Sequence, residues 1–129
     1  ILNNGAYDGG RILKSRTVDM LFKNQLPDAL HLNYAFTEHP WISATGQFPD
    51  TADTFSFAWA IEDNDAEQIR PKGAGYWSGL TNCYYTIDRQ NGVAIAYFNQ
   101  FFPFNDKTAF DFYRLYESEV YATIRNEGS

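Results

Sequence analysis

The stretch VAIAYFNQFF, residues 93–102, is apolar on both faces of the strand it predicts. Successive side chains of a strand point to opposite faces of its sheet, and both alternating sets here are largely apolar. An antiparallel sheet with one face in water would instead alternate apolar with polar residues. We therefore expect a sheet covered on both faces. Residues 107–125 can cover one face, and the other face needs more than this chain offers.

Two further segments read as strands. TFSFAWAIE, residues 54–62, alternates aromatic or aliphatic residues with small or polar ones, which is the period-two pattern of a strand. GYWSGLTNCYYTID, residues 75–88, predicts a second strand, and Asn91-Gly92 predicts a hairpin turn before the third. Pro103 ends that third strand. The sequence thus predicts a three-stranded antiparallel sheet.

Helical spacing appears at both ends of the chain. The first helix is predicted over about residues 16–25, with Ser15 as its N-cap and Pro27 beyond its end. The second is predicted over about residues 107–125, with an apolar side formed by Phe112, Leu115, Tyr116, Val120 and Ile124. Asp111, Glu117 and Glu119 are expected on its wet side. Residues 27–53 read as a long irregular connection. The fold class is α+β, and residues 1–129 read as one partial domain.

Composition excludes several functional classes. Net charge is −6 with no basic cluster, so no nucleic-acid partner is expected. No apolar run is long enough to suggest a membrane partner. His31 and His39 lack a metal-ligand spacing, and neither a metal nor a cofactor is predicted. Cys83, the single cysteine, is expected to be a buried, inert thiol.

Other conspicuous residues receive structural interpretations. Trp41 and Trp59 are expected in the core, and Tyr84 and Tyr85 in cross-strand packing. The acidic run at 62–65 is expected to be a solvated hairpin tip, because its spacing does not match a calcium loop.

The aromatic run around residues 76–80 contains small residues where a buried strand would carry bulk. Gly79 follows Tyr76, Trp77 and Ser78 and precedes Leu80. A glycine in a strand marks either a close approach of a ligand or backbone, or a bulge or packing notch. The residues alone leave both interpretations open.

A wider string of segments resembles a known family. NNGAYDGGRILKSRTVDMLFKNQL, a strand ending in AWAIE, GAGYWSGLTNCYYTIDRQNGVAIAYFNQFFPF and a helix ending in SEVYATI follow in family order. Together they resemble the C-terminal portion of the serine β-lactamase and penicillin-binding-protein-like superfamily. The closest likeness is to its class C β-lactamase, esterase and acyltransferase branch. The resemblance implies the C-terminal part of a β-lactamase/transpeptidase-like α/β fold and covers nearly the whole chain; residues 28–53 match poorly.

The resemblance also implies roles for five residues. Trp77-Ser78-Gly79 stands where the family carries its third motif, Lys-Thr-Gly in many members and His-x-Gly or Trp-x-Gly in esterase-like ones. The residue after that glycine, Leu80, would give a backbone N–H to the oxyanion hole, and Gly79 would let the backbone approach the acyl group. Tyr76, Trp77 and Ser78 would contact substrate. Tryptophan in place of lysine argues against recognition of a lactam carboxylate and for an ester or acyl substrate.

The family's nucleophile motif, Ser-x-x-Lys, is missing from this chain. Its serines are Ser15, Ser43, Ser56, Ser78, Ser118 and Ser129, and none has lysine three residues later. The chain also begins with Ile-Leu-Asn-Asn and no methionine. We therefore expect the last third of such an enzyme, inactive alone, whose partner is the N-terminal remainder or a second copy of the chain. Two alternatives stay open: a binding module that contacts a partner through its apolar sheet face, and a structural domain whose likeness is accidental.

Overall fold

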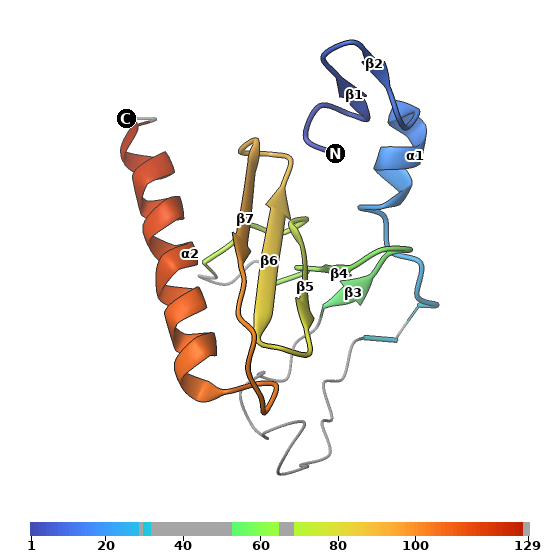
Figure 1. Cartoon of the computed structure of the whole chain (residues 1–129). Coiled ribbons are helices and arrows are strands. Elements are labelled where there is room, and N and C mark those ends of the chain that lie inside the picture. Colours follow the sequence, from blue (N-terminus) through green and yellow to red (C-terminus); the bar gives the residue numbers. More distant parts are fainter. Residues whose placement is uncertain (29, 32–52, 65–68, 128–129) are drawn as a thin grey trace.

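The computed structural model describes residues 1–28, 30–31, 53–64 and 69–127. Within these residues the chain forms a small N-terminal hairpin, a short helix, a five-stranded antiparallel sheet and a long C-terminal helix. Figure 1 shows the long helix α2 (Lys107–Glu127) running along one side of the sheet, with the short helix α1 (Ser15–Met20) away on the other side. Trp41 and the predicted connection over 27–53 fall almost wholly outside the described residues.

The sheet has five strands where the sequence predicted three, because two predicted strands fold back on themselves. The segment 54–62 becomes a hairpin of β3 (Thr54–Phe55) and β4 (Ala60–Ile61). The Ser56 side chain causes the break: its Oγ accepts the backbone N–H of Ala58 at 3.0 Å and of Trp59 at 3.1 Å. A serine side chain that takes over these backbone donors favours a turn over an extended strand.

The segment 75–88 divides in the same way. It forms β5 (Gly75–Gly79) and β6 (Cys83–Asp88), which pair antiparallel with Gly79 opposite Cys83. The connecting residues 80–82 include Asn82 at φ +61°, a left-handed conformation that asparagine tolerates. The predicted continuous strand is therefore a hairpin whose tip begins at Leu80.

The third predicted strand is confirmed but shorter: β7 is Val93–Tyr97. The Asn91-Gly92 turn joins it to β6, with Gly92 at φ +68°. Asp88 secures this turn, because its carboxylate accepts the backbone N–H of Gln90 at 2.8 Å and of Asn91 at 3.1 Å. Strand order is β3-β4-β5-β6-β7, so every strand pairs with its neighbour in the chain.

The N-terminal residues form a short hairpin followed by helix α1. Strands β1 (Ala6–Tyr7) and β2 (Gly10–Arg11) form a hairpin across Asp8-Gly9. Helix α1 ends at Met20, well before the predicted residue 25, because the chain leaves it to pair with the sheet: Gln25 N–H donates to the Phe55 carbonyl at 2.8 Å. The predicted cap is also wrong, since Lys14 is the N-cap and makes no side-chain capping bond.

Helix α2 matches its predicted span, but it buries a different side. The core holds Ala109, Tyr113 and Tyr121 from α2 against Tyr84 and Ile95 of the sheet. Val120 and Ile124 pack at the edge of this core, as predicted. Phe112, Leu115 and Tyr116 do not: they are 54%, 59% and 42% exposed.

Polar side chains set the orientation of α2. Tyr113, Glu117 and Tyr121 are spaced by four residues and therefore lie on one face of the helix. They meet Thr86 and Asp88, which share one face of β6: Tyr113 Oη lies 2.7 Å from Thr86 Oγ1, and Tyr121 donates to Asp88 at 3.0 Å. An apolar stripe elsewhere on α2 is left facing outward for this reason.

Candidate functional site

The five predicted site residues lie together at the β5 end of the β5–β6 hairpin. Tyr76 through Gly79 are strand residues, and Leu80 begins the turn, 54% exposed. The Tyr76 ring is buried beneath the Arg70 guanidinium, whose carbon lies 3.9 Å from the ring centroid. The Trp77 ring contacts the Phe55 ring edge-on, with 5.1 Å between the ring centroids. The neighbouring side chains Tyr76 and Trp77 therefore pack against different residues.

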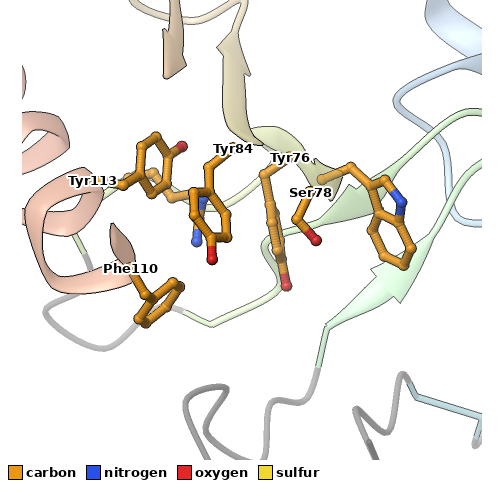
Figure 2. Close-up of a pocket in the computed structure, with 7 residues that line it drawn as sticks. Tyr76, Ser78, Tyr84, Phe110 and Tyr113 are labelled. Carbon is orange, nitrogen blue, oxygen red and sulfur yellow. The ribbon is translucent and has the colours of Figure 1, made fainter. Parts of the chain in front are cut away.

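A narrow pocket opens beside this strand. Tyr76 and Ser78 line it from β5, Tyr84 from β6, and Phe110 and Tyr113 from α2 (Figure 2). Its volume is about 10 Å³, space for about one water molecule. Ser78 therefore contributes a hydroxyl to a small, largely aromatic space between the sheet and α2.

A buried charge cluster, which was missed from the sequence, adjoins the pocket through Arg70. Glu117, predicted on the wet side of α2, is 0% exposed. Its carboxylate accepts from Thr86 at 2.6 Å, from Arg70 at 3.2 Å and from Arg114 at 2.7 Å. Asp111 and Glu119 are exposed, as predicted. The available signal was the four-residue repeat of Tyr113, Glu117 and Tyr121, which marks one helix face.

The cluster continues to the acidic segment that was predicted to be a solvated tip. Glu62 is 5% exposed and binds the Arg70 Nε at 3.2 Å, so this part of the prediction is wrong. Asp53, also buried, accepts a hydrogen bond from the Tyr76 hydroxyl and another from the Asp63 backbone N–H. Burial, and then repulsion from Asp53, raises the pKa of Glu62 to about 7.

The two glycines of β5 differ in what the fold requires of them. A Cβ at Gly75 would lie 2.3 Å from Trp59 Nε1, so Gly75 is the packing notch of this strand. Among the described residues, a Cβ at Gly79 would make ordinary contacts with Cys83 alone, its Cβ at 3.4 Å and its carbonyl oxygen at 4.0 Å, and Gly79 has no positive φ. Trp59 is 8% exposed, which confirms its predicted place in the core.

The predictions for Cys83 and Tyr84 have different outcomes. Cys83 is half-buried, and its thiol donates to the Asn99 carbonyl at 3.2 Å. Tyr84 stacks on Tyr97 of the neighbouring strand at 6.5 Å, which confirms its cross-strand packing. Within the described ranges no His, Cys, Asp and Glu side chains gather as a metal site, and no helix there is long and apolar enough to cross a membrane.

Comparison with known proteins identifies relatives of the chain. No family model matches it. Over 118 residues it is 32% identical to monacolin J acid methylbutanoyltransferase from Aspergillus terreus strain NIH 2624 / FGSC A1156, and 31% identical to a second A. terreus protein of that name. Each match covers 88% of this chain and 29% of the relative. The chain thus spans less than a third of the length of these curated relatives.

Solved structures agree with the sequence matches. The LovD6 mutant of simvastatin synthase (LovD) from A. terreus has a TM-score of 0.71 at 26% identity, covering 88% of this chain and 29% of that one. Unliganded LovD has a TM-score of 0.68 at 28% identity, covering 86% and 30%. The family resemblance drawn from the sequence is confirmed: in sequence and fold, this chain is a homologue of the C-terminal portion of the LovD acyltransferases, whose fold is β-lactamase-like.

Proposed function

We propose that this chain forms one wall of an acyl-serine active site and supplies the Leu80 backbone N–H to its oxyanion hole. The nucleophile belongs to another polypeptide segment, the N-terminal remainder of the same enzyme. The reaction is transfer of an acyl group from an ester, amide or lactam. The similarity to acyltransferases of β-lactamase-like fold supports this proposal.

The observation that carries the proposal is the glycine at position 79. Neither its φ nor its packing requires glycine, whereas Gly75 on the same strand cannot accept a Cβ. An open backbone at Gly79, next to an exposed turn at Leu80, suits the approach of a substrate carbonyl. Trp77 and Ser78 then flank the bound substrate, and Tyr76 supports the strand from beneath.

In the proposed reaction the serine oxygen bonds to the substrate carbonyl carbon and its proton passes to a base. The carbonyl oxygen becomes an oxyanion, to which the Leu80 N–H donates. Collapse expels the alcohol or amine, which takes up the proton, and an acceptor later removes the acyl group from the serine. A positioned backbone donor of this kind lowers the barrier by about 3 kcal/mol.

Replacement of Leu80 by proline tests the proposal directly. Proline lacks the N–H, and it suits the first central position of a turn. Leu80→Ala keeps the N–H while removing the exposed side chain, so it is the matched control. The assay is hydrolysis of p-nitrophenyl butyrate by the assembled enzyme, meaning this chain together with the polypeptide that carries Ser-x-x-Lys.

We expect Leu80→Pro to lower kcat by about 10²- to 10³-fold and Leu80→Ala to change it by less than about threefold. Equal activities of the two variants would show that the Leu80 N–H does not contribute to the oxyanion hole. An assembled enzyme that neither hydrolyses the ester nor forms an acyl-serine, detected by intact mass, would contradict the function itself.

A second candidate function is a non-catalytic interaction module. Phe98, Phe112 and Leu115 are large apolar residues that are between 54% and 80% exposed, and they favour this function because exposed apolar side chains can contact a partner. Gel filtration of the native preparation separates the two proposals. A co-eluting polypeptide with Ser-x-x-Lys supports the enzyme, and a homodimer without one supports the module.

A further inference from the structure

Asn82 closes the turn that begins at Leu80. Gly79 and Cys83 face each other across the β5–β6 ladder, so residues 80–82 form a three-residue hairpin loop. Loops of this length end in a residue of left-handed conformation, and Asn82 holds it at φ +61°. Glycine adopts this conformation at the lowest cost, and asparagine tolerates it better than most other residues.

The side chain of Asn82 is completely buried and fully hydrogen-bonded. Its Nδ2 donates to the carbonyls of Phe101 at 3.0 Å and Pro103 at 2.8 Å. Its Oδ1 accepts from the Tyr84 hydroxyl at 3.1 Å and from the Asp106 backbone N–H at 2.9 Å. Carbonyl partners on one side and an N–H on the other fix which end of the amide is nitrogen.

These bonds attach the hairpin tip to the segment that leads into α2. Asp106 in turn accepts the Ala109 N–H at 2.9 Å, so the start of α2 is part of the same assembly. Leu80 thus lies between two fixed points: Gly79, held by strand pairing, and Asn82, held by its amide. The exposed Leu80 side chain contributes little to holding its own backbone.

We propose that Asn82 is a positioning residue that holds the Leu80 N–H ready for the oxyanion. This rests on the proposed function, and Asn82 itself touches no substrate. A donor that is fixed before the reaction needs no reorganisation when charge develops. Displacement of a reacting group by about 1 Å can cost about 10²-fold in rate.

The test uses Asn82→Gly, which permits the positive φ but removes all four side-chain bonds. A milder variant, Tyr84→Phe, removes only the hydroxyl bond to Oδ1 and serves if Asn82→Gly does not fold. The control is Tyr121→Phe, which loses one buried hydrogen bond to Asp88 at the far end of β6. In the assembled enzyme, p-nitrophenyl butyrate is the probe. In the 129-residue chain, amide hydrogen exchange of Leu80 and Thr81 is followed by NMR.

We expect Asn82→Gly to lower kcat by 10- to 100-fold with KM changed less than about twofold, and to speed exchange at Leu80 and Thr81. Tyr84→Phe should act in the same direction more weakly, and Tyr121→Phe should leave kcat unchanged. Equal kcat losses in Asn82→Gly and Tyr121→Phe, or unchanged kcat and exchange in Asn82→Gly, would overturn the proposal. If the wild-type assembly has no ester turnover, the proposed function fails separately, and exchange at Leu80 still decides whether Asn82 holds the turn.

Discussion

The stability of this chain should fall between acid and neutral pH because of Glu62. Its carboxyl group is buried, faces Asp53 and Arg70, and has a pKa raised to about 7 from 4.5. The folded chain therefore holds this proton more tightly than the unfolded chain does. The resulting stabilisation is fully present below pH 4.5 and is lost as the pH rises through 7.

The size of the effect follows from the two pKa values. One pKa unit corresponds to about 1.4 kcal/mol, so a rise from 4.5 to about 7 is worth at most about 3 kcal/mol. Arg70, whose Nε lies 3.2 Å from the Glu62 carboxylate, partly offsets the cost of ionising it. Asp53 adds to that cost, so Asp53→Asn should lower the pKa of Glu62 toward its ordinary value.

Urea unfolding of wild type and Glu62→Gln at several pH values between 4.5 and 8 measures the effect. Glutamine cannot ionise, so the variant should not lose this stability. The free energy of unfolding of Glu62→Gln minus that of wild type should therefore rise by up to about 3 kcal/mol between pH 4.5 and pH 8. Asp63→Asn is the control, since this neighbouring carboxylate pairs with Lys72 in a much more exposed position. Parallel curves for wild type and Glu62→Gln would refute the argument.

Three further outcomes are expected. Gly75→Ala should destabilise the fold by about 1–3 kcal/mol in urea unfolding, because its Cβ would meet the Trp59 ring, whereas Gly79→Ala should cost less than about 1 kcal/mol. In the ester assay Gly79→Ala should nevertheless lower kcat/KM, and retention of full activity would contradict a close substrate approach there. Glu117→Ala should cost about 3–5 kcal/mol because it leaves the Arg70 charge buried, and a loss below 1 kcal/mol on thermal unfolding would show that the cluster adds little.

The sequence predicts this fold best where a single periodicity extends over many residues. The long helix was located almost to its ends, and β7 begins where alternation and the Asn91-Gly92 turn place it. Both failures in the sheet occur at residues that suit a turn: the Ser56 side chain accepts nearby backbone N–H groups, and Asn82 adopts a left-handed conformation. Ser56 and Asn82 create turns inside segments whose apolar alternation continues across them. Alternation alone cannot reveal this, because the pattern continues through a tight hairpin.

In the candidate site, too, sequence patterns revealed some features and missed others. Tyr76 to Leu80 lie together because the motif resemblance covers consecutive residues, and their roles at the site stay predictions. The buried cluster of Glu62, Arg70 and Glu117 was missed because its members are far apart in the sequence, and each, taken singly, is typical of a solvated surface. Only the tertiary arrangement, in which one arginine lies between two carboxylates, makes their burial possible.

The order of the strands has a consequence for how the chain folds. Each ladder of the sheet joins segments that are consecutive in the chain, from β3 through β7. Contacts between sequence neighbours keep contact order low, and little loop-closure entropy is lost before each ladder forms. The sheet can therefore grow hairpin by hairpin during synthesis, with α2 docking last onto a surface that is already made. A released chain that ends at residue 106 should then show protected β5 and β6 amides under pulse labelling.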